Sequence, residues 1–270
     1  MPAPAHAKFV WFDGSVVPWE AARVHVSTAT VLRGANVFEG VRAYWNSDER
    51  ELYIFRNDAH MTRLWNSAKI MRMAIPWTAE ELTQAELAVL RANTFDGTVW
   101  FRLTLYFGEE ETTGAADQSH VGGFILPRLS PHAKVVTEGV DSCISTWARI
   151  SDTSMPPRVK AGANYHNAAF ARTEARLNGY TGQPIMLNER GKVSEGPGAC
   201  LMMVRGGRLI TPPITSNILE SITRTTILEL ARDDGMPTDE REVDRTELYI
   251  ADEAFFCGSG AEITPINSVD

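Results

Sequence analysis

The stretch PPRVKAGANY, residues 156–165, places one lysine, Lys160, between a proline-stiffened approach and a run of small residues. Small neighbours let another group come close to the lysine. A lysine that forms a Schiff base needs such crowding, because its amine must be partly desolvated or lie near positive charge to be unprotonated at neutral pH. By composition alone, however, the stretch is more typical of a solvated surface lysine that precedes a helix.

Four further stretches accompany the lysine along the chain: FEGVRAY (38–44), VSEG (193–196), ITR (222–224) and Gly258–Pro265. Together the five resemble, in order and over nearly the whole chain, the landmarks of class IV aminotransferases, the fold type IV enzymes that use pyridoxal 5′-phosphate (PLP). Within that family the sequence is most similar to branched-chain aminotransferases. D-amino-acid transaminases, (R)-amine transaminases and aminodeoxychorismate lyases share the scaffold.

The resemblance implies PLP as the cofactor and gives three residues a role around its ring. Lys160 takes the position of the covalent anchor and catalytic base. Tyr165 matches the tyrosine that hydrogen-bonds the O3′ of the cofactor, and Glu195 matches the carboxylate paired with the pyridine nitrogen. A negative partner keeps that nitrogen protonated, and only a protonated ring withdraws electrons effectively. Without the family, Glu195 is typical of a surface carboxylate at a strand end.

The cofactor phosphate is expected at a helix N-terminus, where unpaired backbone N–H groups and the helix dipole favour an anion. Residues 220–224 offer such a start, with Ser221 as the N-cap. The resemblance assigns Ile222 and Thr223 to the phosphate, with charge from Arg63 and a further hydroxyl from Ser259. Taken singly, Thr223 is equally a cap residue and Arg63 a solvated side chain.

Small residues follow an apolar strand in FFCGSGAE, residues 255–262, so that successive backbone N–H groups can point at a carboxylate. The family uses this turn for the substrate α-carboxylate, although the same pattern fits a plain strand-to-helix turn. The resemblance places the substrate among seven residues, with Arg102 as a supporting charge: Arg33, Phe38, Arg42, Trp100, Arg102, Gly260 and Ala261.

The sequence departs from the family pattern at several positions. Arg33 and Trp100 stand where pocket tyrosines are usual. Arg33 either recruits an acidic group or turns into solvent. GPGAC, residues 196–200, lacks a polar pair beneath the cofactor, and residues 107–123 lack the branched-chain signature. The family usually continues beyond the landmark at 258–265 into a further strand and helix, so a truncated chain and a naturally short member both stay open.

Local patterns predict the secondary structure. They indicate a hairpin at 9–17 that turns at Asp13-Gly14, helices at 57–73, 78–93, 166–178 and 222–234, and strands at 99–107, 140–147, 184–188, 200–204 and 208–211, with a loop at 108–123. Thr78 and Glu81 predict a capping box at the start of the second helix, and Gly179 and Gly235 are expected to end the last two helices. We expect an α+β protein of fold type IV: a small N-terminal α/β domain (1–126), a linker (127–134), and a larger β-barrel-like PLP-binding domain with helices (135–270). PLP would lie in the cleft between them.

Composition narrows the partners. A net charge of −8 and a pI near 5.3, with no basic run, argue against nucleic-acid binding. Cys143, Cys200 and Cys257 are isolated, without metal-ligand spacing, which suits a reducing compartment. The chain has no apolar run of about 18 residues, so we expect a cytoplasmic protein without a membrane partner. The resemblance implies a homodimer.

The predicted function is ping-pong transfer of an amino group from an L-amino acid, most similar to branched-chain substrates, to 2-oxoglutarate. Two alternatives stay open. One is a different PLP chemistry on the same scaffold, namely D-amino-acid or (R)-amine transamination or aminodeoxychorismate lysis. The other is a non-catalytic member that keeps the fold as a binding protein.

Overall fold

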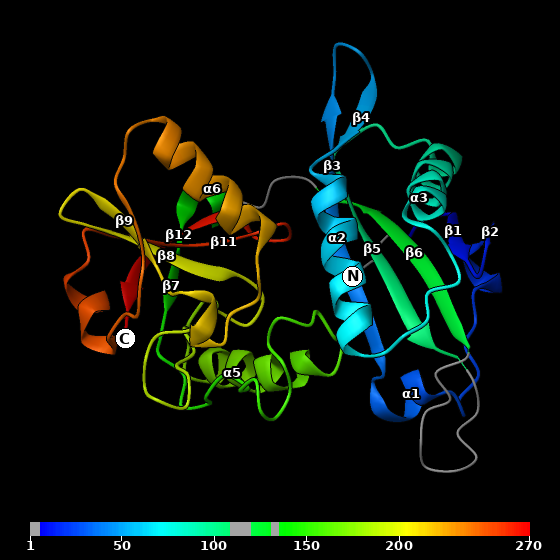
Figure 1. Ribbon diagram of the computed structural model, residues 1–270. Coiled ribbons are helices and arrows are strands. Elements are labelled where there is room, and N and C mark those ends of the chain that lie inside the picture. The colour runs from blue at the N-terminus through cyan, green and yellow to red at the C-terminus, as the bar shows by residue number, and fades with distance from the viewer. Residues whose placement is uncertain (1–5, 109–119, 131–134) are drawn as a thin grey trace. The chain divides into compact units, whose positions relative to one another are not determined.

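The computed structural model of the protein describes residues 6–108, 120–130 and 135–270 (Figure 1). The chain divides into two compact units. Unit 1 comprises Met1–Pro131 with Val159–Ala163, and unit 2 comprises His132–Arg158 with Asn164–Asp270. The segment that carries Lys160 therefore belongs to unit 1, although the sequence placed it in the C-terminal domain. Each unit is described by itself.

Unit 1 is built on a six-stranded antiparallel sheet with the order β2-β1-β6-β5-β3-β4. Its strands are β1 (Phe9–Phe12), β2 (Ser15–Pro18), β3 (Asn36–Asn46), β4 (Glu51–Ile54), β5 (Val99–Phe107) and β6 (Val121–Leu129). The predicted first hairpin is confirmed. Asp13 and Gly14 both adopt positive φ, at 44° and 97°, as a tight type I′ turn requires.

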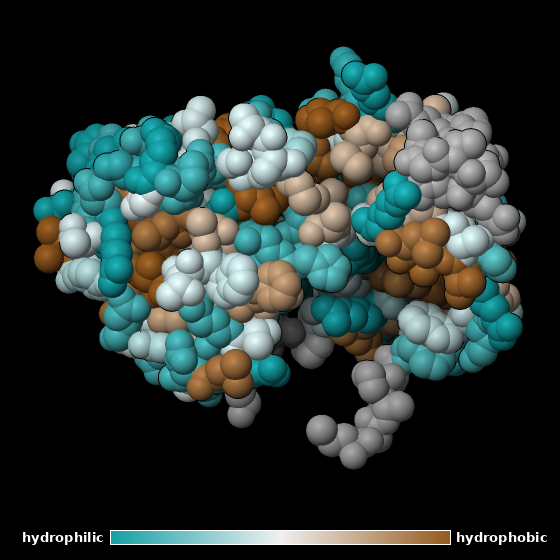
Figure 2. Space-filling view, turned by 90° about the horizontal axis from the view of Figure 1, so that it is seen from below, coloured by the Kyte–Doolittle hydropathy of each residue, from teal (hydrophilic) through white to brown (hydrophobic). Residues whose placement is uncertain are grey.

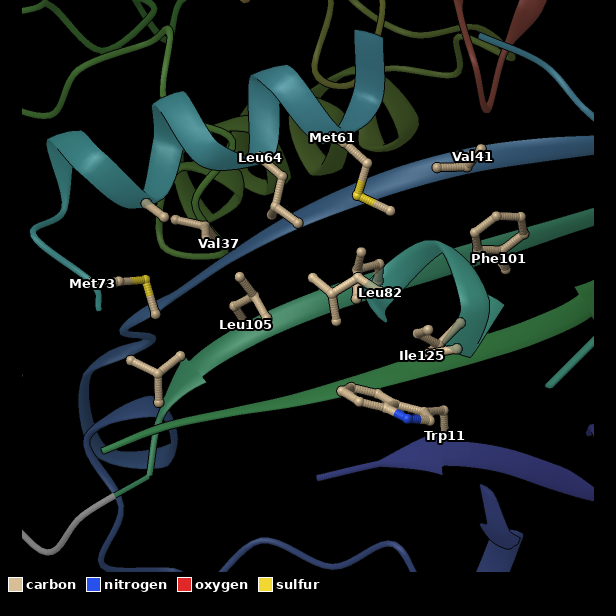
Figure 3. Close-up of a cluster of buried hydrophobic side chains, with 14 of the residues drawn as sticks. Trp11, Val37, Val41, Met61, Leu64, Met73, Leu82, Phe101, Leu105 and Ile125 are labelled. Atoms are coloured by element: carbon tan, nitrogen blue, oxygen red, sulfur yellow. The ribbon is translucent and has the colours of Figure 1, made fainter. Parts of the chain in front are cut away.

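Two helices of unit 1 pack on one face of this sheet: α2 (Asn57–Ile70) and α3 (Ala79–Asn93). The predicted capping box of α3 is present, since Thr78 and Glu81 bond each other's backbone N–H groups. Figure 3 shows Met61 and Leu64 of α2 facing Val37 and Val41 of β3 across the buried core. Shorter elements of the unit are the 3-10 turn η1 (Trp19–Ala21) and helix α1 (Ala29–Arg33).

Unit 2 contains a mixed six-stranded sheet with the order β10-β9-β8-β11-β12-β7. Its strands are β7 (Val140–Ser142), β8 (Cys200–Arg205), β9 (Arg208–Thr211), β10 (Thr238–Glu240), β11 (Glu253–Gly258) and β12 (Glu262–Val269); its helical segments are α4 (Val135–Glu138), α5 (Asn164–Leu177), α6 (Ile222–Asp233), η2 (Ile214–Ser216) and η3 (Arg245–Ile250). The two predicted helix-ending glycines, Gly179 and Gly235, both adopt positive φ.

Several expectations need correction. Within the described residues the sheet of unit 2 is open, with β10 and β7 as its edges, and does not close as a barrel. Residues 184–188 form only isolated bridges, at Ile185 and Leu187, in place of the predicted strand. Strand β6 takes residues 121–123 from the predicted loop and 127–129 from the predicted linker, because all nine of its residues pair with β5. The rest of these predictions, at 109–119 and 131–134, lies outside the described residues.

The surface of each unit mixes polar and apolar residues on the face shown in Figure 2. Exposed apolar side chains include Val26, Val31 and Leu32 around α1 in unit 1, and Leu177 at the end of α5 in unit 2. Among the described residues, no helix has the length and apolar character that would let it cross a membrane.

One buried carboxyl group stands out in the core of unit 1. Glu86 of α3 is fully buried, and its Oε2 accepts a hydrogen bond of 2.7 Å from Nδ2 of Asn57. Its Oε1 has no partner within the described residues. Burial raises the pKa of Glu86 to about 8, against the opposing effect of the Asn57 hydrogen bond.

We predict that Glu86→Gln removes a pH-dependent loss of stability. Folded Glu86 keeps its proton between pH 4.5 and about 8, where the unfolded chain has released it. The free energy of unfolding of the wild type therefore falls across this window, by up to about 1.4 kcal/mol per pH unit. The variant should match the wild type near pH 4.5 and exceed it at pH 8 in urea unfolding. An equal difference at both pH values would contradict the assignment.

Candidate active site

Lys160 is held by backbone contacts with β3 and α2 in unit 1. The N–H of Phe38 donates to the carbonyl of Lys160 at 2.9 Å, and Val37 forms a bridge with Ala161. The N–H of Lys160 donates to Oγ of Ser67 at 3.2 Å. Its amine lies 5.0 Å from the centre of the Phe38 ring. Both flanks of the lysine are therefore fixed, while the amine sits over an aromatic face.

A buried charged cluster surrounds Arg63 on α2. Its Nε and Nη2 donate to the two oxygens of Glu39 at 2.8 and 2.6 Å, and Nδ1 of His60 lies 2.7 Å from Oε2 of the same carboxylate. Burial opposes ionisation of Glu39, but the Arg63 charge and the hydrogen bonds outweigh it and hold the pKa at about 2. Burial also lowers the pKa of His60, against the effect of Glu39. Arg63 is thus fixed as a cation.

Four of the predicted substrate residues of unit 1 share one face of the sheet: Phe38, Arg42, Trp100 and Arg102. Gly40 pairs with Arg102 and Arg42 pairs with Trp100, so alternation puts these side chains with Phe38 on the face opposite Glu39. The Arg102 guanidinium carbon lies 3.5 Å from the centre of the Phe38 ring. A Cβ at Gly40 would lie 2.8 Å from the Trp100 ring, so only glycine leaves room for this indole.

The polar groups of Trp100, Arg42 and Arg33 differ in what they contact. The indole Nε1–H of Trp100 is buried and has no acceptor within the described residues. Nη1 of Arg42 donates to the carbonyl of Ser130 at 3.1 Å. Arg33 is the last residue of α1, and its side chain is exposed.

In unit 2 the centre of the site is Glu195, which is 4% exposed. Its Oε1 pairs with Nη2 of Arg149 at 2.8 Å. Its Oε2 accepts from the N–H of Leu219 at 3.2 Å and from Sγ of Cys200 at 3.5 Å. Burial raises the pKa of the Cys200 thiol well above its ordinary value, so the sulfur keeps its proton and donates.

The Leu219 hydrogen bond ties Glu195 to the start of α6. Oγ of Ser221 accepts from the N–H of Arg224, as an N-cap should. Within the described residues the backbone N–H groups of Ile222 and Thr223 have no acceptor. The first turn of α6 therefore keeps two backbone N–H donors without acceptors. Unpaired N–H groups at a helix N-terminus are the arrangement that binds anions.

The remaining predicted residues of unit 2 lie in two segments. Ser259, Gly260 and Ala261 form the turn between β11 and β12. The turn approaches the loop after Glu195, since a Cβ at Gly258 would lie 3.5 Å from the carbonyl oxygen of Gly198. Tyr165 is the second residue of α5.

The predicted set thus falls into two groups. Unit 1 carries Lys160, Arg63 and the aromatic sheet face, and unit 2 carries Tyr165, Glu195, the α6 start and the β11–β12 turn. The sequence interpretation missed Glu39, His60 and Arg149, which fix the predicted charges. A signal existed for Glu39, because it lies in the quoted FEGVRAY stretch and strand alternation turns it toward the helices.

The donor set fits a phosphorylated pyridine. An ionised carboxylate offers about four lone-pair sites, and three on Glu195 are filled by Arg149, Leu219 and Cys200. One site on Oε1 is left for a ring N–H. The unpaired N–H groups at the start of α6 suit a phosphate.

Comparison with known proteins agrees with this chemistry. The profile of the family Amino-transferase class IV matches residues 36–269. The chain is 36% identical over 269 residues to the branched-chain-amino-acid aminotransferase of Escherichia coli K12, covering 98% of this chain and 85% of that protein.

Two solved structures show the same fold. One is the branched-chain amino acid aminotransferase of Thermobaculum terrenum in its PLP form (43% identity, TM-score 0.92, 98% of this chain and 86% of that one). The other is the T.th. branched-chain amino acid aminotransferase in complex with N-(5′-phosphopyridoxyl)-L-glutamate (34% identity, TM-score 0.91, 98% and 86%).

The chain therefore belongs to the class IV aminotransferases, and the predicted α+β, fold type IV class is confirmed. It is an enzyme, a transaminase whose cofactor is PLP. The alternative of a non-catalytic binding protein is not supported.

The Glu39–Arg63 pair gives a prediction. Because the pKa of Glu39 is depressed to about 2, its contribution to stability is complete above pH 4.5 and is lost as pH falls through about 2. Glu39→Gln leaves the Arg63 cation without its buried anion and should lower the free energy of unfolding by roughly 3 kcal/mol at pH 7. Urea unfolding should show this gap narrowing between pH 4.5 and 2. A gap that does not change with pH would rule out an ionised Glu39.

Proposed function

We propose that this transaminase moves the amino group of a branched-chain L-amino acid to 2-oxoglutarate by a ping-pong mechanism. The observation that carries the proposal is the buried Glu195 carboxylate, with one acceptor site left on Oε1, in a chain whose relatives are named branched-chain aminotransferases. The glutamate adduct of the T.th. relative supports glutamate and 2-oxoglutarate as the second pair. One site serves both halves of such a reaction in turn.

The cofactor, when bound, supplies an electron-withdrawing ring that makes the substrate Cα–H acidic. The chain supplies the rest. Lys160 gives its amine as the covalent anchor and, once released, takes the proton from Cα on Nζ. Its backbone is fixed by β3 and Ser67, and the flexible four-carbon stem above it lets the amine swing between these two tasks.

Glu195 holds the ring nitrogen in its protonated form. Arg149 balances the charge of the carboxylate and fixes Oε1, and Leu219 and Cys200 occupy Oε2. We assign Tyr165 to the O3′ oxygen. The backbone N–H groups of Ile222 and Thr223 would hold the phosphate, and three side chains would add hydroxyls and charge: Thr223, Ser259 and Arg63.

The substrate is assigned to the sheet face of unit 1 and to the β11–β12 turn. Phe38 gives an apolar surface for an aliphatic side chain. The buried indole N–H of Trp100 has no acceptor within the described residues, and a substrate α-carboxylate would supply one. Arg42 and Arg102 add positive charge, and Gly260 and Ala261 add backbone donors. Arg33 is assigned to the pocket edge. A homodimer and a cytoplasmic location stay predictions.

A substrate panel tests the proposal. We expect L-leucine, L-isoleucine and L-valine to be turned over with 2-oxoglutarate, and borohydride to fix the cofactor on the peptide containing Lys160, as seen by mass spectrometry. Lys160→Ala should lose both signals. Turnover of D-amino acids, (R)-amines or aminodeoxychorismate in preference to L-leucine would reject the substrate assignment, and cofactor fixed on another lysine would reject the anchor.

A second variant tests the role of Trp100. Trp100→Phe keeps the ring over Gly40 but removes the indole N–H, so it should cost the substrate one hydrogen bond, a rise in KM for L-leucine of roughly three- to tenfold. Steady-state kinetics and the melting temperature should show this with unchanged stability. An unchanged KM would exclude contact between this N–H and the substrate.

A further inference from the structure

Unit 2 contains a pocket of about 370 Å³ that includes none of the residues assigned to the cofactor. It lies between the C-terminal half of α5, the segment that follows it, and the β11–β12 hairpin. Six of its lining residues carry the argument: Val140, Arg172, Arg176, Tyr180, Gln183 and Glu262. Its volume is in the range of small-molecule sites.

One side of the pocket is cationic. Arg172 and Arg176 lie four residues apart on α5, so their side chains project from the same face of the helix. Both are exposed, and neither makes an ion pair or side-chain hydrogen bond with another part of the chain that the structure describes. Two adjacent guanidinium groups with donors to spare suit a carboxylate.

A hydrogen-bond acceptor lies beside this positive charge. Oε1 of Gln183 is buried and has no donor within the described residues. This oxygen and Nη2 of Arg172 converge over Gly198, since a Cβ built there would lie 3.6 and 3.3 Å from them. The carboxylate of Glu262 also lines the pocket and adds negative potential. A buried acceptor without a donor favours a ligand that brings an N–H group.

The remaining wall is apolar. Val140 and the partly exposed Tyr180 line the pocket. An α-amino acid satisfies all three sides, since it carries a carboxylate and an ammonium on one carbon atom together with an aliphatic group.

We propose that this pocket is a second binding site for an α-amino acid, taken up as the zwitterion. The carboxylate binds Arg172 and Arg176, the ammonium binds Oε1 of Gln183, and an aliphatic side chain packs on Val140 and Tyr180. The site goes beyond the proposed function: its binding of an amino acid stands by itself, and only its influence on the enzyme rests on the proposed substrate assignment. Because the pocket shares Gly260 and Ala261 with the turn assigned to the substrate, its occupancy gives amino acids a route to influence the enzyme.

The test separates this pocket from the catalytic site. Holoenzyme whose lysine linkage has been reduced by borohydride cannot transaminate, so calorimetric titration with L-leucine reports equilibrium binding alone. We expect saturable binding, weakened about tenfold or more by Arg172→Gln and by Arg176→Gln. Arg91→Gln, an exposed arginine in the last turn of α3, is the matched control and should bind L-leucine as the wild type does.

Ligand variants keep the test decisive even where an arginine variant folds poorly. On the reduced wild-type enzyme, leucinamide lacks the carboxylate and 4-methylpentanoate lacks the ammonium, so each should bind about tenfold more weakly than L-leucine or worse. Equal binding of 4-methylpentanoate would overturn the assignment to an amino acid. Absence of saturable L-leucine binding, or binding that Arg172→Gln and Arg176→Gln leave unchanged in folded protein, would overturn the site.

Discussion

A buried carboxylate that must stay ionised needs a buried cation, and this requirement organises both units. Glu195 meets Arg149 in unit 2, and Glu39 meets Arg63 in unit 1. Removal from water penalises the charged form of a carboxylate heavily, and a buried cation beside it offsets that penalty. Each pair therefore fixes two charges at once. Under the proposed function the cofactor meets the carboxylate in unit 2 and the guanidinium in unit 1.

Hydrogen bonds limit what each pair can still bind. Arg63 gives two of its nitrogens to Glu39, so its orientation is set by the sheet that carries the carboxylate. Glu195 has three acceptor sites filled, so the direction in which it can receive a further donor is also set. Cys200 contributes to this because its burial keeps the thiol protonated. Cys200 belongs to no motif in the sequence, and its burial is what makes it a hydrogen-bond donor to Glu195.

Features that depend on a few neighbouring residues, such as turns, helix caps and helix ends, could be predicted from the sequence. The hairpin at Asp13, the capping box at Thr78 and the ends of α5 and α6 are short-range features, and they were confirmed. The class of the fold followed from a resemblance across five stretches. Long-range pairing was less accessible: the open edge of the unit 2 sheet and the extent of β6 depend on partners far along the chain.

The same limit applies to the site. Lys160, Glu195 and Arg63 were found by motif, and their roles stay predictions. Arg149 was missed because it lies far before Glu195 in the sequence and belongs to no local pattern. The pocket of Arg172 and Gln183 was missed for the same reason. The two side chains meet only where α5 packs beside Gly198, a residue far along the chain from Arg172. A glycine in a loop has many explanations until its neighbours are known.

Glu39 and Glu86 show that burial does not decide the charge of a carboxyl group by itself. Both are almost completely buried in unit 1, and burial raises the pKa of each. Glu39 has a guanidinium and a histidine within 2.8 Å, and its pKa is about 2. Glu86 has a single amide donor, and its pKa is about 8. The hydrogen-bonding and charged partners of each carboxyl group, and not its depth of burial, therefore decide whether it is ionised. The single amide donor beside Glu86 cannot replace the hydration that a full negative charge would lose.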